Sequence, residues 1–360
     1  MSFADKTHIP LTALRRQISE ALFPSFSQGM ISLVVLAACL WCGWIGSEWL
    51  FVRAVYWGSA DDCRAILGQG ACWAVVAKKL SFVAVGRYTN AEVWRPELVI
   101  TLFLTALIAS YFRFSWGKRM AVMWYGFIFF SHALLSGEML GLPPVPPDRW
   151  GGFALTVVLA TTGLGIALPL GVVLALARRS QMAVIRSLSV TYIELVRGVP
   201  LVAVLFLSSV MLPLLMPETF AMSKVSRAYL AIGLFAAAYI AEVIRGGLQT
   251  IPPGQFEAAR ALGLGYVATT LNVVLPQAIR VTVPPIINTM VAIFKDTSLV
   301  VVIGLIDFLG VVRLVTVEPE WKLFYLEPLI FAAAVYFFFC WYMSRVGFRI
   351  ERYLLNGTAR

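Results

Sequence analysis

Long apolar segments recur along the whole chain and are separated by shorter polar connections. An apolar helix of about 20 residues crosses a hydrocarbon layer roughly 30 Å thick while its backbone groups remain hydrogen-bonded internally. The pattern therefore predicts an all-α integral membrane protein with about eight transmembrane helices. These are expected near residues 28–46, 97–112, 120–137, 152–176, 198–216, 228–244, 284–310 and 326–344.

Composition agrees with this pattern. Hydrophobic residues make up 60% of the 360 residues and charged residues only 13%, and the mean hydropathy is +0.82. A water-soluble domain of this size needs far fewer apolar residues for its core. The extreme N-terminus is too polar for a signal peptide, and no A-x-A cleavage site follows the first apolar segment. We therefore expect residues 1–27 to be a cytoplasmic tail.

The basic residues indicate how the chain is oriented. They are scattered at the ends of apolar segments, as in Arg178, Arg179 and Arg345, and most fall on one side if both termini are cytoplasmic. Lys and Arg gather in cytoplasmic connections of membrane proteins. The net charge of +10 is therefore interpreted as a topology signal, and nucleic acid is not an expected partner.

Prolines mark an internal boundary. The segment GLPPVPPDRW, residues 141–150, contains four prolines and cannot form a continuous helix. It separates an accessory transmembrane region, residues 28–140 with an external loop at 47–96, from a core at residues 151–345. Residues 346–360 are expected to form a second cytoplasmic tail.

The external loop contains Cys63 and Cys72, and a disulfide could form and persist there. The sequence leaves their bonding open, because a disulfide requires a specific geometry. Cys39, Cys42 and Cys340 lie inside apolar segments, where we expect small apolar side chains without a redox or metal role.

The longest internal cytoplasmic connection, residues 246–280, contains an unusual polar passage. Pro252 and Pro253 precede a short helix that has Glu257 in or near its first turn. Gly263 can close this helix, and a second short helix should follow.

That second helix should end at Pro276, because proline cannot continue it. Two short helices at an angle suit docking to a partner. Periodicity alone favours a hairpin on the membrane surface or a plain connection, and a DNA-reading helix-turn-helix is disfavoured because basic residues are few.

The residue identities favour docking. Residues 257–276 resemble the EAA loop of ABC importer permeases, whose pattern is EAA, glycine and I-x-L-P at the same spacing. The one departure is Val273, which replaces isoleucine and keeps the β-branch. In that family the loop is the coupling helix, which seats in a cleft of the cytoplasmic ATPase. The matched residues are Glu257, Ala258, Ala259, Gly263, Leu275 and Pro276.

The resemblance extends beyond the loop. Residues 150–178, 192–207, 238–255 and 287–305 resemble the polar amino-acid branch of these permeases. The three preceding segments and the external loop are similar to the longer permeases of general L-amino-acid importers, including those for glutamate, glutamine, aspartate and asparagine.

The resemblance implies a five-helix permease core preceded by three accessory helices, in a bacterial inner membrane. It also implies three kinds of partner: a cytoplasmic ABC ATPase dimer, a second homologous permease subunit and a soluble substrate-binding protein. ATP and Mg would bind to the ATPase. The sequence contains no Walker-type, HExxH or GxGxxG motif, so no catalytic residue, metal site or cofactor is expected in this chain.

Charges inside a membrane segment are costly and are candidates for function. Lys295 would lie about 16 Å along a helix that begins near Pro284, close to the bilayer midplane. One hypothesis is a broken helix whose new N-terminus, at cap-forming residues, faces a bound carboxylate. The alternative is a buried structural ion pair with another membrane segment, for example with Glu242. The candidate pathway residues are Asn288, Lys295, Asp296, Thr297, Ser298 and Glu242.

Glu242 and Arg245 are three residues apart and can also form a local pair. Glu194 and Arg197 repeat this spacing, and we expect them to serve topology and helix entry.

Two other classes of function are weighed against an ATP-driven importer. An ion-coupled secondary transporter of amino acids could use Lys295, Asp296 and Glu242. A membrane enzyme has less support, because no nucleophile and base pattern occurs and His132 lies in an apolar segment, where a packed side chain is expected. The amino acids carried, the homodimeric or heterodimeric state and the role of the accessory helices stay open.

Overall fold

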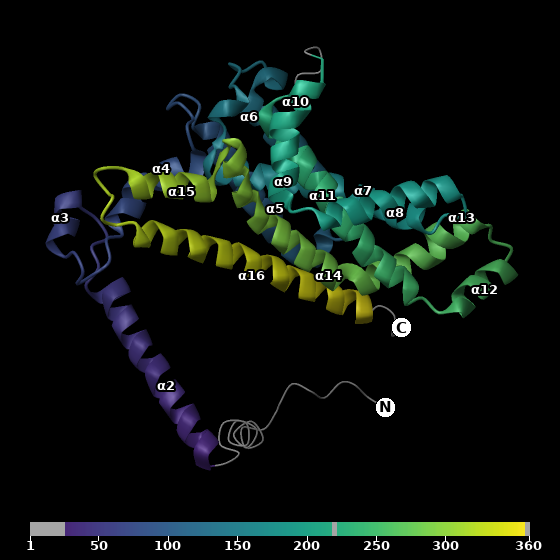
Figure 1. Ribbon diagram of the computed structural model, residues 1–360, viewed down its shortest axis with the longest axis horizontal. Helices are drawn as coiled ribbons and strands as arrows, with labels where there is room; N and C mark the ends of the chain where they lie inside the picture. Colours follow the sequence, from purple (N-terminus) through teal and green to yellow (C-terminus); the bar gives the residue numbers. More distant parts are fainter. Residues whose placement is uncertain (1–25, 218–221, 357–360) are drawn as a thin grey trace. The chain divides into compact units, whose positions relative to one another are not determined.

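The computed structural model describes residues 26–217 and 222–356, and helices dominate this part of the chain (Figure 1). The chain divides into two compact units, one ending at Ala77 and the other beginning at Lys78. The predicted all-α class agrees with the described elements, whose extended segments are limited to the two-residue strand Ile306–Asp307 and isolated backbone bridges.

Between residues 26 and 77, the described part of the first unit, there is a single long apolar helix. α2 (Phe26–Ser47) continues into the π-helical turn η1 (Glu48–Val52). Together, residues Phe26–Val52 are long and apolar enough to cross a membrane, and few of them are buried within the unit. This is the surface expected of a helix that lies against lipid.

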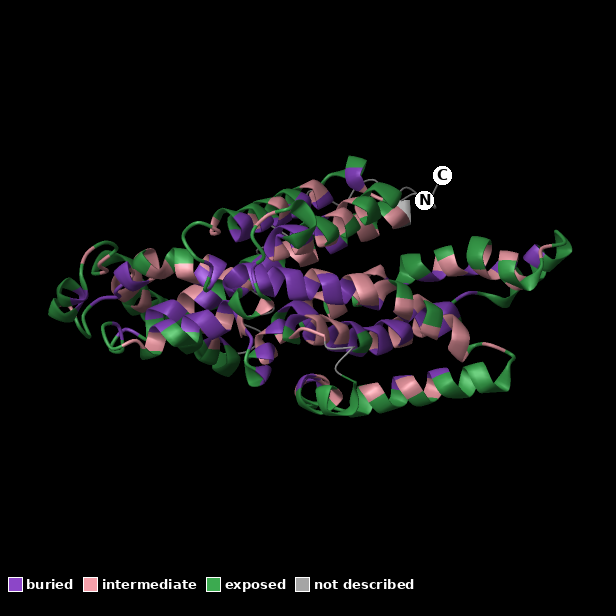
Figure 2. Cartoon of the chain, turned by 90° about the horizontal axis from the view of Figure 1, so that it is seen from above, coloured by how far each residue is buried: buried purple, intermediate pink, exposed green. Residues whose placement is uncertain are grey.

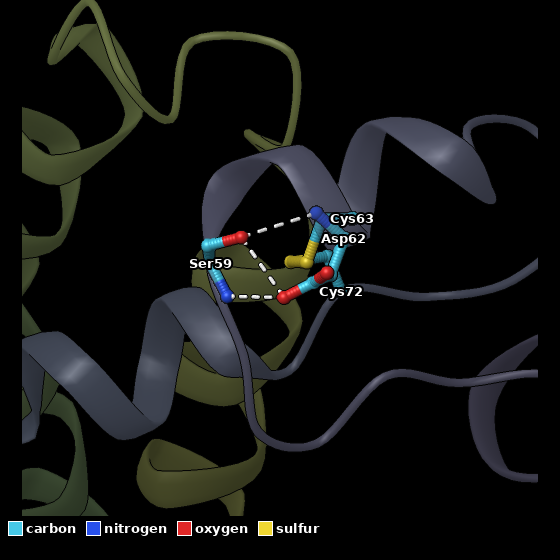
Figure 3. Close-up of a disulfide and its surroundings, with 4 residues drawn as sticks. All are labelled: Ser59, Asp62, Cys63 and Cys72. Atoms are coloured by element: carbon cyan, nitrogen blue, oxygen red, sulfur yellow. Dashed lines mark hydrogen bonds between the residues drawn. A yellow bond between two sulfur atoms is a disulfide. The ribbon is translucent and has the colours of Figure 1, made fainter.

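The polar loop after α2 is closed by a disulfide between Cys63 and Cys72 (Figure 3). Cys63 lies in the short helix α3 (Ala60–Ala65), and both cysteines are fully buried. Ser59 and Asp62 form a capping box at the start of α3, in which the Ser59 backbone N–H donates to Asp62 Oδ2 at 2.7 Å. A capping box satisfies N–H groups that a helix start leaves unpaired.

The second unit is built around two closely packed helices, α7 (Gly152–Arg178) and α11 (Lys224–Gln249). A Cβ atom added to Gly163 would lie 2.7 Å from Cγ2 of Ile232. The same construction at Gly171 gives 2.6 Å to Cγ2 of Ile240. Glycine therefore allows the two helices to approach closely, as small residues do in membrane proteins. Figure 2 shows that buried residues follow the packed helices in long stretches.

The remaining long helices pack around this pair. They are α14 (Leu275–Asp296), which contacts α11, and α16 (Leu326–Asn356), which contacts α14. The shorter α15 (Phe308–Val317) packs on α7 and α16. In the accessory region, α5 (Trp94–Tyr111) and α6 (Lys118–Ser136) contact each other and α7.

In the described part of the chain, five helical segments are long and apolar enough to cross a membrane: Phe26–Val52, Gly152–Arg178, Lys224–Gln249, Tyr266–Ile303 and Leu326–Leu354. A sixth candidate is a bent pair, described below. α5 and α6 occupy the predicted positions but begin with charged residues and are not among these five.

The predicted segment at residues 198–216 is preceded by an additional helix. α8 (Ala183–Gly198) is followed, after a break that includes Pro200, by α9 (Leu201–Phe206), the π-helical η5 (Leu207–Met211) and α10 (Leu212–Leu215). The two parts form an angle of 106°. Glu194 and Arg197, which we expect to serve topology and helix entry, lie within the last two turns of α8, just before the break that leads into α9.

The predicted segment at residues 284–310 was placed too late in the sequence. The helix runs from Tyr266 to Ile303, and both Pro284 and Pro285 lie inside it. It ends at Gly304, which adopts a positive φ of 80°. The depth estimated for Lys295 from a start at Pro284 is therefore also wrong.

Contacts at one end of the second unit join the accessory region to the core. Gly86 forms a backbone bridge with Trp150, and Lys79 Nζ lies 2.7 Å from Glu318 Oε1. Lys79 belongs to α4 (Ala74–Val85), whereas Glu318 follows α15. Burial raises the pKa of Tyr88 above its ordinary value, so the phenol keeps its proton and donates to the Leu135 carbonyl at 3.1 Å.

Candidate coupling site and substrate pathway

The polar passage begins with α12 (Pro253–Ala261). Pro252 is extended, and Pro253 occupies the first helical position, where its missing N–H costs nothing. Glu257 is predicted to lie in or near the first turn of this helix. It is the fifth residue, directly after the first turn, and its side chain is exposed.

Gly263 closes α12, as the sequence predicts. It has a φ of +75°, and its N–H donates to the Arg260 carbonyl at 2.9 Å. The N–H of Leu264 donates to the Ala259 carbonyl at 3.1 Å. This pattern is a Schellman cap, in which a left-handed residue satisfies the last carbonyl groups of a helix.

The second helix does not end at Pro276, contrary to the prediction. α13 (Tyr266–Ala268) passes into the π-helical η7 (Thr269–Val274) and directly into α14, where Pro276 lies in the first turn. A proline lacks a backbone N–H and clashes with the carbonyl four residues earlier in a regular helix. The wider π turn directly before Pro276 accommodates it, so that the loop is continuous with a membrane helix.

One side of the passage packs against its own chain. Ala259 is 1% exposed and Val274 is 1% exposed, and α12 contacts η7. Gln277 Nε2 donates to Gln255 Oε1 at 3.0 Å, which links α12 to α14. Ala259, one of the residues matched to the EAA pattern, is therefore an internal packing residue.

The other side of the passage is exposed and mixed in character. Glu257, Ala258, Arg260 and Ala261 are exposed on α12. Beyond them, three apolar side chains are strongly exposed at the turn: Leu262 (80%), Tyr266 (64%) and Val267 (66%). Figure 1 shows α12 and α13 together at one end of the second unit, opposite α15. Exposed apolar groups rimmed by charges are typical of a protein-binding surface.

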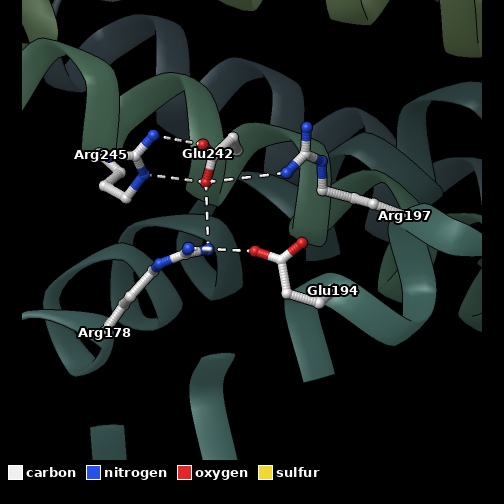
Figure 4. A network of polar contacts seen from close by, with 5 residues as sticks. All are labelled: Arg178, Glu194, Arg197, Glu242 and Arg245. Atoms are coloured by element: carbon white, nitrogen blue, oxygen red, sulfur yellow. Dashed lines mark hydrogen bonds and ion pairs between the residues drawn. The ribbon is translucent and has the colours of Figure 1, made fainter. Parts of the chain in front are cut away.

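A cluster of charged residues links three helices near this passage (Figure 4). Glu242 Oε2 of α11 lies 3.2 Å from Arg178 Nη1 of α7 and accepts from Arg245 Nε at 3.0 Å. Arg178 also pairs with Glu194 of α8 at 3.0 Å, and Arg197 lies 3.9 Å from Glu242. We name these five residues the arginine–glutamate network.

The network is connected to the start of α12 through Arg179. Its Nη1 donates to the Leu248 carbonyl at 3.1 Å, and its guanidinium lies 5.9 Å from the centre of the Phe256 ring. Arg178 and Arg179 are adjacent at the end of α7. The end of α7 therefore contacts both the network and the polar passage.

Two pairings are predicted for Glu242, and the structure shows one of them. The local pair with Arg245 is present, but no ion pair joins Glu242 to Lys295 within the residues that the structure describes. Sequence reasoning also missed Arg178, which pairs with Glu194 and Glu242. The sequence places Arg178 at the end of an apolar segment. Such basic residues are interpreted as topology signals alone, so its pairing is not predicted.

The remaining pathway candidates lie at the end of α14 and the start of the 3-10 helix η8 (Thr297–Ile303). The predicted broken helix is instead a direct change from α to 3-10 geometry. Asp296 makes no side-chain cap, and Thr297 is buried with its hydroxyl donating to the Phe294 carbonyl at 2.8 Å. Ser298 is half-buried.

Asn288 and Lys295 share an exposed face of α14. They are seven residues apart, which is close to two helical turns, and both are exposed, as is Ala292 between them. Asp296 is half-buried beside Lys295. We name Asn288 and Lys295, with Asp296 next to them, the polar stripe of α14.

Comparison with known proteins shows what the chain is similar to. Residues 167–352 match the family described as binding-protein-dependent transport system inner membrane component. The chain is 39% identical to the inner membrane amino-acid ABC transporter permease protein YhdY of Escherichia coli (strain K12), over 94% of this chain and 93% of that protein.

It is also 33% identical to the glutamate/glutamine/aspartate/asparagine transport system permease protein BztC of Rhodobacter capsulatus, over 93% and 92% of the two chains. Among solved structures, a chain from an amino acid ABC transporter with histidines has a TM-score of 0.50 and 30% identity. That match covers 56% of this chain and 91% of the solved chain.

Proposed function

This chain belongs to the family of inner-membrane components of binding-protein-dependent transport systems, and from this premise we propose that it carries polar L-amino acids into the cell. It is a non-catalytic, multi-pass permease subunit of an ABC transporter. The relatives do not support the ion-coupled alternative, since they are named as ABC permeases. The observation that carries the proposal is the exposed, capped passage from Glu257 to Pro276, in a chain of this family.

The exposed side of this passage is the proposed contact with the ATPase. Leu262, Tyr266 and Val267 supply apolar area, and Glu257 and Arg260 lie beside them. The internal side is attached by Ala259 and by the hydrogen bond from Gln277 to Gln255. A force on α12 would therefore reach α14 through the contact of α12 with η7 and through this hydrogen bond, because η7 and α14 are continuous.

The arginine–glutamate network gives a second route from the ATPase to the membrane helices. Arg179 contacts Leu248 and Phe256, while Arg178 bonds Glu194 and Glu242. The network thereby holds α7, α8 and α11 together close to the coupling surface. We propose that α7, α8 and α11 tilt together when the ATPase closes.

The polar stripe of α14 is the proposed contact with the substrate. Lys295 is exposed and forms no ion pair in the described part of the chain, so its ammonium group is available for a carboxylate. Asp296 and Asn288 can accept or donate hydrogen bonds to the remaining groups of an amino acid. A second homologous permease would cover this face and complete the pathway.

Orientation and partners complete the proposal. Both termini lie in the cytoplasm, which places α12 on the ATPase side and the Cys63–Cys72 loop outside. A soluble binding protein delivers the amino acid to the outer face, and ATP and Mg bind to the ATPase. Residues 28–140, the accessory region, precede the linker at 141–150 and the core at 151–345.

Uptake measurements test the proposal. Cells with and without this chain are supplied with a panel of labelled L-amino acids, alongside the variants Gly263→Asp and Gly254→Asp. Both glycines are on α12 or at its end with open space around them, but only Gly263 has a positive φ. We expect the deletion and Gly263→Asp to abolish uptake of the same amino acids, with Gly254→Asp retaining it.

Membrane levels of each variant must be equal for the comparison to hold. Uptake that persists in Gly263→Asp would overturn coupling through this loop. If deletion of the chain reduced the uptake of none of the labelled amino acids, the proposed substrate class would be overturned.

A further inference from the structure

A cavity of about 510 Å³ lies in the second unit, apart from the proposed coupling and substrate residues. It is enclosed by the end of α6, by residues 138–150 and by the start of α11. No residue of the coupling passage, the arginine–glutamate network or the polar stripe lines it. Its volume falls in the range of small-molecule sites, roughly 300 to 1,000 Å³.

Three aromatic rings from three segments meet at this cavity. The ring centre of His132 lies 5.3 Å from that of Tyr229 and 5.9 Å from that of Trp150. His132 Nε2 lies 3.0 Å from Thr162 Oγ1, and this hydrogen bond fixes the imidazole. The faces of aromatic rings carry partial negative charge and attract cations.

The charged and polar groups of the lining, like the aromatic rings, favour a positively charged ligand. Among the lining residues that the structure describes, Glu138 is the only Asp, Glu, Lys or Arg. The hydroxyl groups of Ser136, Ser223 and Ser226 add oxygen acceptors, and those of Ser223 and Ser226 lie 2.9 Å apart. A carboxylate and three rings, with no Lys or Arg in the described lining, favour an ammonium group over an anion.

Trp150 adds a hydrogen-bond donor. Its side chain lines the cavity and is 6% exposed, yet Nε1 is buried and has no partner among the described residues. A buried donor without an acceptor is costly, and most such groups in proteins are satisfied. An oxygen atom of a ligand could accept this hydrogen bond after a small movement of the ring that exposes Nε1 to the cavity.

We propose that this cavity binds a small molecule in which an ammonium group is joined to an oxygen acceptor. The ammonium group lies between Glu138 and the three rings, and the oxygen accepts from Trp150 Nε1. The site is additional to the proposed transport pathway. Two sources supply this chemistry at the surface of a membrane: a soluble amino alcohol or amino acid, and the head group of phosphatidylethanolamine.

Fluorine NMR can locate the binding. The full chain, with its eleven tryptophans replaced by 5-fluorotryptophan, is placed in phosphatidylglycerol nanodiscs and titrated with ethanolamine. The variant Trp150→Phe identifies the resonance of Trp150. We expect that resonance to shift to saturation with ethanolamine, whereas sodium acetate at equal ionic strength leaves it unchanged.

A matched pair of variants tests the role of the carboxylate. Glu138→Gln should raise the apparent dissociation constant of ethanolamine about fivefold, because it removes the charge and keeps the shape, and because Glu138 is exposed and its charge is partly screened. Glu320→Gln, the same change at an exposed residue outside the cavity, should leave it within about twofold. Equal constants for the two variants, or an equal response to acetate, would overturn the proposal.

The lipid composition distinguishes the two sources. If a head group is the occupant, phosphatidylethanolamine nanodiscs should hold the Trp150 resonance at its shifted position and reduce the response to added ethanolamine. If a soluble amine is the occupant, the titrations in the two lipids should agree. Both results support an ammonium site, while the absence of any saturable shift in either lipid rejects it.

Discussion

Glu242 Oε2 on α11 lies 3.2 Å from Arg178 Nη1 on α7, and the two residues are 64 positions apart in the sequence. Arg178 also pairs with Glu194, so this contact joins α7 and α11 to α8 as well. Both side chains are about one-fifth exposed, which limits screening by water. Removing one partner of such a pair leaves the other charge without compensation.

We therefore expect Glu242→Gln to impair transport and folding together. Three arginines would lose their shared carboxylate, and the free energy of unfolding should fall by about 1 to 3 kcal/mol. The measurement is thermal unfolding in detergent combined with labelled amino-acid uptake at matched membrane levels. The same change at the exposed Glu320 is the control, and identical behaviour of the two variants would show that the network has no structural role.

The cap at Gly263 gives a second prediction. An alanine there must adopt a φ of +75°, which costs about 1 kcal/mol, because left-handed backbone is unfavourable for a residue with a Cβ. Gly254→Ala is the control, since Gly254 lies in the first turn of α12 with open space and no positive φ. We expect Gly263→Ala to reduce transport-stimulated ATP hydrolysis of the assembled complex, with Gly254→Ala near wild type.

This pair of variants is informative because neither residue meets a clash. Any difference between them reports the backbone conformation alone. Equal ATP hydrolysis in both would mean that the cap geometry does not influence coupling.

The disulfide of the first unit can be tested in protein extracted from its native membrane. Mass spectrometry of a non-reduced digest should recover a peptide pair linked through Cys63 and Cys72. Closing a loop of this length should stabilise the folded unit by about 2.5 kcal/mol in the chain-entropy picture. The double variant Cys63→Ser, Cys72→Ser should therefore unfold at a lower temperature, whereas Cys39→Ser should not, because that cysteine is free and exposed. Detection of both cysteines as free thiols would reject the bond.

Much of this architecture follows from periodicity and proline chemistry. The apolar segments predict the positions of the long helices. Gly263 is correctly expected to end α12, because a glycine after the last helical residue readily adopts the left-handed conformation that closes a helix. The EAA pattern also identifies the exposed passage. These features depend on local sequence, which is why they can be deduced without a structure.

The errors arise where a neighbouring turn determines the course of a helix, or where residues distant in the sequence determine a contact. Pro276 does not stop its helix, because the π turn η7 absorbs the proline, and a π turn has no simple sequence signal. The pairing of Glu242 with Arg178, rather than with Lys295, depends on how α7 and α11 pack. The cavity near Trp150 requires three separate segments, so periodicity could not reveal it.

Close packing of α7 and α11 gives a fourth prediction. Gly163→Ala would place a Cβ atom 2.7 Å from Cγ2 of Ile232, and overpacking of this kind costs about 1 to 3 kcal/mol. Gly246→Ala on α11 meets no atom within 4 Å and should be neutral or slightly stabilising. We expect Ile232→Ala to restore part of the loss in the Gly163→Ala background, as measured by thermal unfolding. A double variant whose loss equals the sum of the single losses would argue against direct contact.

Lys295 allows the sharpest test of the substrate pathway. Its side chain is exposed on α14, so that replacement should leave folding unchanged, unlike the changes at Glu242 and Gly163. Lys295→Met removes the ammonium group, and Lys295→Arg retains a positive charge with a different shape. If the ammonium binds the carboxylate of the substrate, Lys295→Met should lower uptake about tenfold or more, since a charged hydrogen bond contributes about 1.5 to 3 kcal/mol. Lys295→Arg should retain more uptake than Lys295→Met.

The control is Arg280→Met, which removes another exposed positive charge from α14, about four turns before Lys295. Uptake should be measured over a range of substrate concentrations, together with basal ATP hydrolysis. A rise in the apparent KM with unchanged basal hydrolysis would assign Lys295 to substrate contact, because the ATPase contact at α12 is left intact. If Lys295→Met and Arg280→Met behaved alike, the effect would come from the general charge of α14, and the polar stripe would have no specific role in the pathway.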